Sequence, residues 1–161
     1  MIKHADIVLG LVFGDCAKGK LVNSLAKSGN YTHCLRFGGS GNCGHTSYYK
    51  GKKIVTHYCP TGILYGLRSI IGCGCVVHPE SFLKEIEYLE SQGINTKGKI
   101  FIANNAHIIT DKHLEEDGKD EIIGTTKKGN GPAYRDKYNR TGIQAKDCEA
   151  LRPYLIDLYQ E

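Results

Sequence analysis

Two lysines and a carboxylate lie close together near the start of the chain, in a segment suited to binding phosphate. The segment Gly14-Asp15-Cys16-Ala17-Lys18-Gly19-Lys20 follows the apolar run 7–13 and precedes apolar residues spaced as one face of a helix. A strand, a glycine-bearing loop and a helix start in this order direct backbone N–H groups and the helix dipole at an anion. We therefore predict a phosphate-binding loop at residues 14–20.

This loop departs from the common phosphate-loop pattern at its last position. Gly14, Gly19 and Lys20 keep the usual spacing, but Leu21 stands where a Ser or Thr hydroxyl normally binds Mg²⁺. Asp15 is then the only strong metal ligand that the loop offers, and its carboxylate can also accept a proton. The pattern argues against a generic nucleoside triphosphatase. The simpler alternative is a glycine-rich strand-to-helix turn with solvated lysines.

Length and composition favour one ordinary domain with its own core. The chain has 161 residues, of which 40% are hydrophobic and 24% charged. No apolar run is long enough to span a membrane and no signal-peptide core is present, so we expect a cytoplasmic protein with no membrane partner. The net charge of +4 is scattered along the chain. It argues against a nucleic-acid partner and suits phosphorylated small molecules.

The seven cysteines are expected to be reduced thiols, because nothing in the sequence indicates secretion. A candidate zinc set can be drawn from His57, Cys59, Cys73, Cys75 and His78. However, only one residue separates Cys73 from Cys75, whereas structural zinc sites usually have at least two between paired cysteines. Small buried thiols are the better interpretation.

Strand and helix patterns alternate, which predicts an α/β fold with a mainly parallel central sheet flanked by helices. The expected strands are 7–12, 32–36, 54–58, 69–71 and 99–103. The clearest helix is expected at 79–92, with Pro79 in its first turn and Gly93 just past its end. Segment 47–58, with Lys50-Gly51-Lys52 in its middle, is typical of a β-hairpin.

Two later segments carry weaker patterns. Residues 111–121 are strongly charged and are expected to form an exposed helix or loop with a solvated surface. After Pro153, apolar residues at 154, 155, 158 and 159 follow helical spacing. This stripe predicts a helix whose partners lie in a missing continuation or in another subunit.

A second glycine-rich loop, Gly38-Gly39-Ser40-Gly41-Asn42-Cys43-Gly44-His45-Thr46, follows an expected strand. Its glycines let the backbone approach a ligand closely. Asn42 offers an amide for a base or a phosphate, and His45 can donate or accept a proton near neutral pH. A structural role for the histidine is an equal alternative.

A third loop at residues 123–134, Ile-Gly-Thr-Thr-Lys-Lys-Gly-Asn-Gly-Pro-Ala-Tyr, combines hydroxyls, lysines and glycines. Such a loop presents an anion-binding surface. Arg140 follows it and is a candidate for a bidentate phosphate contact. Taken alone, a turn-rich loop with solvent-facing charge is the simpler interpretation.

Together these loops resemble the adenylosuccinate synthetase family. The family's three motifs are Gly-Asp-Glu-Gly-Lys-Gly-Lys, Asn-Ala-Gly-His-Thr and Ile-Gly-Thr-Thr-Gly-Arg-Gly-Ile-Gly-Pro-Ala-Tyr, which correspond to residues 14–20, 42–46 and 123–134. Segment 57–64 also looks like the family's His-Leu-x-Pro-Ser-Gly-Ile-Leu. The four motifs occur in order over nearly all of the chain. The resemblance implies that residues 1–161 are the N-terminal portion of a single domain with phosphate-loop-like nucleotide-binding architecture.

The resemblance implies a role in purine biosynthesis, in which GTP phosphorylates the 6-oxygen of IMP and L-aspartate then displaces the phosphate to give adenylosuccinate, the precursor of AMP. Asp15 would be the catalytic base and His45 the acid. Mg²⁺ would be held by Asp15 and Gly44. The implied GTP-binding residues are Gly14, Asp15, Cys16, Ala17, Lys18, Gly19, Lys20, Gly44, His45 and Thr46. The implied IMP-binding residues are Asp15, Lys18, Asn42, Cys43, Gly44, His45, Thr126 and Arg140, with Arg140 reaching the neighbouring subunit of a homodimer.

Several departures from the family pattern keep alternatives open. Cys16 and Ala17 replace Glu and Gly, and Lys127-Lys128 replaces Gly-Arg. The family's guanine-reading and aspartate-gripping segments are absent, so a truncated, non-catalytic nucleotide-binding or dimerisation module is one alternative. A phage-type aminoadenylosuccinate synthetase acting on dGMP is another. That branch replaces the loop aspartate with serine, so Asp15 favours IMP.

Overall fold

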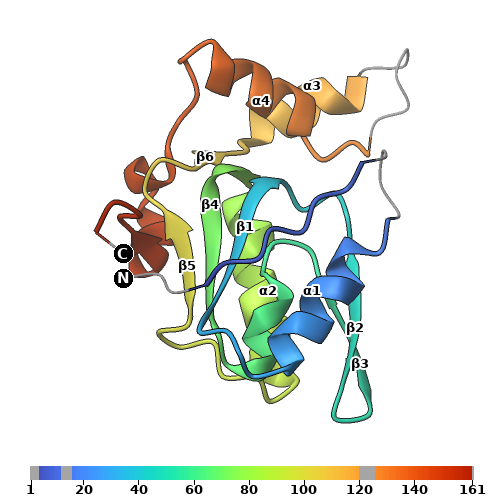
Figure 1. The fold of residues 1–161 in the computed structure, drawn as a ribbon. Helices are drawn as coiled ribbons and strands as arrows, with labels where there is room; N and C mark the ends of the chain where they lie inside the picture. The colour runs from blue at the N-terminus through green and yellow to red at the C-terminus, as the bar shows by residue number, and fades with distance from the viewer. Residues whose placement is uncertain (1–3, 12–15, 120–125, 161) are drawn as a thin grey trace.

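The computed structural model describes residues 4–11, 16–119 and 126–160 (Figure 1). Its elements follow one another in the order α1 (Lys18–Lys27), β1 (His33–Gly39), β2 (His45–Tyr49), β3 (Lys52–Thr56), η1 (Thr61–Tyr65), β4 (Arg68–Val77), α2 (Pro79–Ser91), β5 (Ile100–Ala103), β6 (His107–Ile108), α3 (Asp111–Lys119), α4 (Asn130–Tyr138), η2 (Ala145–Asp147), η3 (Glu149–Tyr154) and β7 (Leu155–Ile156). The η elements are short 3₁₀ turns.

The main sheet has the strand order β1-β4-β5-β7, and β6 pairs with the far end of β4. Every one of these pairs is parallel. The prediction of an α/β fold with a mainly parallel sheet is therefore confirmed. Because parallel strands share one direction, the segments that follow β1 and β4 leave the sheet at the same edge, where open α/β sheets bind their ligands.

Helix α2 and the sheet build the main core. Phe82, Ile86 and Leu89 form the buried face of the helix and pack in one cluster with apolar residues of β4 and β5. The imidazole of His78 caps the helix by accepting the N–H of Ser81 at 3.3 Å. Gly93, with a φ of +81°, follows its C-terminus. The helix predicted at 79–92 is confirmed.

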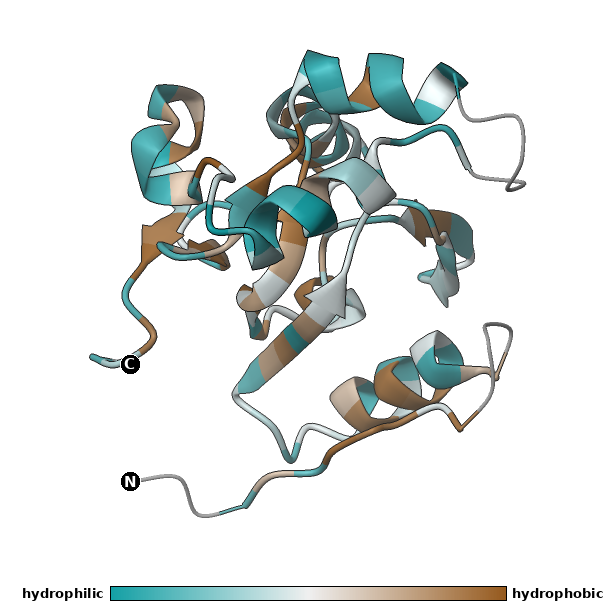
Figure 2. Ribbon diagram, turned by 90° about the horizontal axis from the view of Figure 1, so that it is seen from above, coloured by the Kyte–Doolittle hydropathy of each residue, from teal (hydrophilic) through white to brown (hydrophobic). Residues whose placement is uncertain are grey.

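Four of the five predicted strands are also confirmed, and β4 extends further than expected, to Val77. The strand predicted at 7–12 is wrong for residues 7–11, which form no strand and leave Ile7 77% and Leu11 96% exposed. Figure 2 shows the apolar colour of this segment. Within the described residues β1 pairs only with β4, so its outer edge is open, and an apolar run was not enough to pair this segment with it.

The helix predicted after Pro153 is wrong as well. Leu155 and Ile156 form β7, which pairs with Ile102 and Ala103 of β5. The ring of Tyr154 packs edge-on against Phe82 at a centroid distance of 5.1 Å. Three residues of the apolar stripe, Tyr154, Leu155 and Leu158, therefore pack on the existing core, while Tyr159 is 95% exposed. The free edge of β5 decided the conformation at 155–156.

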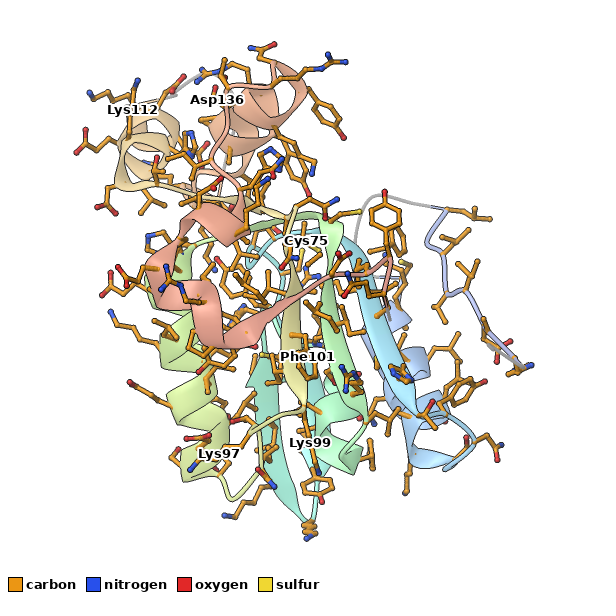
Figure 3. All side chains as sticks on the ribbon, turned by 90° about the vertical axis from the view of Figure 1, so that its left-hand side faces the viewer. Cys75, Lys97, Lys99, Phe101, Lys112 and Asp136 are labelled. Carbon is orange, nitrogen blue, oxygen red and sulfur yellow. The ribbon has the colours of Figure 1, made fainter. Side chains whose placement is uncertain are left out.

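Helices α3 and α4 form a separate pair beyond the carboxyl end of β4 (Figure 3), where Lys112 and Asp136 mark the helices and Cys75 marks the strand. A small cluster of Val76, Ile109 and Ala133 lies beneath them. The charged segment at 111–121 is thus a helix over its described residues. Its expected solvated surface is incomplete, because His113 and Asp117 are buried.

The hairpin predicted at 47–58 is confirmed by the antiparallel pair β2 and β3, in which His45 lies opposite Thr56. Its turn places Lys50 at a φ of +48° and Gly51 at +78°. Both angles match the two-residue turn that joins twisted strands. No helix in the described ranges is long and apolar enough to cross a lipid bilayer.

Candidate active site

The described parts of the three predicted loops gather at the carboxyl edge of the sheet. Strand β1 ends at Gly39 and leads into the second loop, which returns as β2 at His45. Helix α1 begins beside this loop, and α4 carries the end of the third loop (Figure 1). The hairpin, α1 and α4 therefore supply one part of the site each.

The phosphate loop is described only from Cys16 onward, so the predictions for Gly14 and Asp15 lie outside the described residues. Ala17 sits just before α1 with a φ of +55°. A residue with a Cβ pays about 1–2 kcal/mol for that left-handed conformation. The glycine at this position in the family motif would avoid the cost.

Cys16 and Lys18 interact directly within this loop. The Lys18 ammonium lies 2.7 Å from Cys16 Sγ. Its hydrogen bond, aided by its charge, lowers the pKa of the thiol from the ordinary value of 9.0. A Cβ atom added at Gly10 would meet both side chains, with Lys18 Nζ 2.5 Å away. Lys18 therefore has the Cys16 thiol as its partner within the loop.

His45 lies directly against the start of α1. A Cβ atom added at Gly19 would fall 2.5 Å from His45 Nδ1, so only glycine leaves room for the ring. Burial lowers the pKa of His45 below the ordinary 6.5, and the nearby charges of Arg36, His57 and Lys18 lower it further. These effects favour the neutral form of the imidazole.

Arg36 of β1 holds the second loop from beneath. Its guanidinium donates to the carbonyl of Ser40 at 2.5 Å and to that of Gly38 at 3.4 Å. It also donates to the carbonyl of His57. One side chain thus fixes the glycine-rich loop to the turn that follows β3.

The third loop is tied to the second by two side chains. Lys128 donates to the carbonyl of Gly41 at 2.9 Å. The hydroxyl of Tyr134 accepts the N–H of Gly39 at 2.9 Å and lies 3.0 Å from the carbonyl of Gly74. These bonds bring residues that are 87 and 95 positions apart in sequence to one place.

The remaining predicted residues have varied placements. Lys20, Asn42, Cys43, Gly44, Thr46 and Thr126 are exposed. Arg140 is also exposed and takes a φ of +62° just past the end of α4. Within the described ranges, no hydrogen bond or ion pair joins Arg140 or Thr126 to the other predicted site residues. The loops around His45 are brought together, whereas these two residues stand apart.

The candidate zinc residues do not gather into a metal-binding group among the described residues. Across the described residues, no three His, Cys, Asp or Glu side chains gather closely enough to hold a metal. Cys59 and Cys75 are buried as expected, but Cys73 is exposed, so a buried thiol was wrong there. Of the two residues predicted to hold Mg²⁺, Asp15 lies outside the described residues and Gly44 is exposed.

Sequence reasoning missed two residues that organise the site. Arg36 was assigned only to a strand, although it binds three carbonyls. Glu85 of α2 is 7% exposed and accepts the N–H groups of the turn at 57–59. A signal for Glu85 was available, because it falls within the apolar face of α2, where a carboxylate needs a partner.

The fold and the site define a class: an α/β protein with glycine-rich loops at the carboxyl edge of a parallel sheet, the edge where such sheets bind their ligands. The family model for adenylosuccinate synthetase matches residues 7–157. The chain belongs to the adenylosuccinate synthetase family.

Named relatives agree with this assignment. The chain is 46% identical to the adenylosuccinate synthetase of Phytophthora infestans over 95% of its length and 29% of the relative. It is 44% identical to the Phaeodactylum tricornutum enzyme over 89% of its length and 28% of the relative. The chain therefore spans about a third or less of these two curated relatives.

Solved structures show the same fold. The fully ligated adenylosuccinate synthetase of Plasmodium falciparum matches with a TM-score of 0.75 and 36% identity, over 86% of this chain and 34% of that one. The succinoaminodeoxyadenylate synthetase of cyanophage S-2L matches with a TM-score of 0.71 over 92% of this chain and 44% of that one. At 23% identity, the phage protein supports the fold alone.

Proposed function

We propose that this chain carries the phosphoryl-transfer half of an adenylosuccinate synthetase, which joins L-aspartate to IMP at the expense of GTP. The observation that carries the proposal is the packing of His45 against Gly19, which joins the histidine loop to the phosphate loop. Phosphoryl transfer depends mainly on positioning and charge neutralisation. A histidine held over a phosphate-binding helix start supplies both.

In this proposal Asp15 removes the N1 proton of IMP, because a neutral lactam oxygen is a poor nucleophile. Lys18, Gly19 and Lys20 bind the GTP phosphates, while Asn42 and Thr126 bind IMP. His45 donates a proton near the transferring phosphoryl group. Its pKa is lowered in the free protein, mainly by burial, and the bound phosphates would raise it again.

Asp15 and the Gly44 carbonyl are the residues that would hold Mg²⁺. The ion would supply positive charge that neutralises the phosphates. Arg140 is proposed to reach the IMP phosphate of a second subunit in a homodimer. Its exposure and its fixed position at the end of α4 support that role.

The test is GTP- and aspartate-dependent formation of adenylosuccinate from IMP by the purified chain, with calorimetric titration of GTP and of IMP. Asp15→Ala is expected to abolish product formation, and Asp147→Ala, at an exposed position, serves as the matched control. Near-normal activity of the Asp15 variant would contradict its assignment as base.

A second candidate is a non-catalytic nucleotide-binding module. The left-handed Ala17, with a φ of +55° where the family motif has glycine, favours it. Binding of GTP or IMP without product supports the module, and binding of dGMP in preference to IMP supports the phage-type substrate. Retained Asp15 favours IMP between these two nucleotides.

A further inference from the structure

We propose that Glu85 and Arg36 act together as positioning residues that hold the glycine-rich loop at 38–44 through the backbone turn at 57–59. Neither residue needs to touch a nucleotide for this role. The proposal deepens the proposed function, and its nucleotide-binding arm rests on that function.

Glu85 binds the whole polar edge of the turn. Its carboxylate accepts the N–H groups of His57 at 2.9 Å, Tyr58 at 3.0 Å and Cys59 at 2.9 Å. Pro60 follows and has no N–H to offer. The carboxylate therefore satisfies every N–H group of this turn, at a position where an unpaired group would be costly.

Two routes lead from this turn to the glycine-rich loop. His57 gives its N–H to Glu85, while its carbonyl accepts from Arg36, which also binds the carbonyl of Ser40 at 2.5 Å. Gly41 lies directly on the ring of Tyr58, because a Cβ atom added there would overlap that ring. Both routes begin at amides that Glu85 holds.

Packing alone does not hold the loop on this side. A cavity of about 450 Å³ is bordered by Gly41, His57, Tyr58, Glu85 and Lys128. Side chains that border an open space have fewer neighbours to fix them. The polar bonds of Arg36 and Glu85 therefore act beside those of Lys128 and Tyr134 in setting where Asn42 to His45 lie relative to α1.

The test compares Glu85→Gln, Arg36→Lys and the double variant, with Glu87→Gln as the control on an exposed position of the same helix. Amide hydrogen exchange is measured without nucleotide. We expect exchange to quicken at least about tenfold, in both single variants, over 57–59 and also over 39–45. Glu87→Gln is expected to leave both segments unchanged.

Affinity for IMP and GTP gives the second readout. Each single variant is expected to weaken binding about tenfold or more, and the double variant is expected to add little, because both act through one turn. A merely structural role would give additive losses. If Glu85→Gln fails to fold, Arg36→Lys carries the test, since it leaves α2 intact.

The outcomes separate the two proposals. Faster exchange at 57–59 alone, with 39–45 unchanged in both single variants, overturns the positioning role. Additive losses of affinity overturn it as well. A wild-type chain that binds neither nucleotide overturns the proposed function, while the exchange data still decide whether the loop is held through this turn.

Discussion

The two loops that are proposed to bind nucleotide are held in different ways. The second loop is fixed by polar side chains from several elements, among them Arg36, Lys128 and Tyr134. The start of α1 relies on close approach, with Gly19 against His45 and Ala17 in a left-handed turn. Along α1, Ala26 is the buried residue, while Leu21 is 52% exposed. Hydrogen bonds from side chains tolerate small changes of volume nearby. The close approach of His45 to Gly19 does not, because it depends on the absence of a Cβ atom.

The largest expected effect comes from Gly19→Ala. The new methyl group must push the His45 ring aside, and overpacking of this kind costs about 1–3 kcal/mol. Affinity for GTP should fall roughly ten- to a hundredfold, as measured by calorimetric titration. Gly118→Ala is the control, because a Cβ atom meets nothing within 4 Å there and should leave affinity unchanged.

Tyr134→Phe tests the second loop, which is held by hydrogen bonds. Loss of the hydroxyl leaves the N–H of Gly39 without its partner, at a cost of about 1–3 kcal/mol in the free energy of unfolding. Urea denaturation measures the change. The control Tyr138→Phe lies at a residue that is 76% exposed and should shift stability by less than about 0.5 kcal/mol. Equal changes in the two variants would contradict the assigned role.

Ala17→Gly should raise the stability of the start of α1. Glycine relieves the left-handed strain, although its freer unfolded chain offsets part of the gain, so stability should rise by less than about 1 kcal/mol. Thermal unfolding followed by circular dichroism measures it. Ala26→Gly, at the buried position within the same helix, should instead lose about 1 kcal/mol or more. A loss in both variants would count against strain at Ala17.

The smallest effect concerns pH. Burial and nearby cations hold the folded pKa of His45 below 6.5, so the unfolded chain binds more protons as pH falls through that value. Stability contributed by His45 is therefore full above 6.5 and is lost below it. His45→Asn should flatten the fall in stability between about pH 7.5 and about pH 5.5 by under about 1 kcal/mol. The pKa of His107 is also lowered, so part of the pH dependence of stability should remain in the variant. If the pH dependence of stability were the same in the His45→Asn variant, that would contradict the lowered pKa of His45.

How far the sequence predicts this molecule depends on whether local chemistry or tertiary pairing decides a segment. Helix α2 and the hairpin were predictable, because Pro79, Gly93 and the Lys50–Gly51 turn are local signals. The end of the chain was not, because an apolar stripe fits a helix or a strand until the edge of β5 is available.

The residues of the site also divide into those that local sequence predicts and those that depend on tertiary contacts. Glycine spacing predicted where the backbone approaches a ligand, and His45 stands beside Gly19 as such a site requires. Arg36 and Glu85 bind backbone groups of the turn at 57–59, far away in sequence, and only the position of Glu85 within the apolar face of α2 gave a local signal. Residues that touch the ligand leave motifs, whereas residues that hold the motif in place mostly do not.

The hairpin β2–β3 also bears on the order in which the molecule assembles. Among the described strands, it is the one antiparallel pair, and only a two-residue turn separates its partners. The strands of each pair in the main sheet are instead joined by a long crossover connection. Contacts between residues so far apart in sequence form slowly. We expect the strand that carries His45 to form early during folding, and its partners on α1 and α4 to arrive after it.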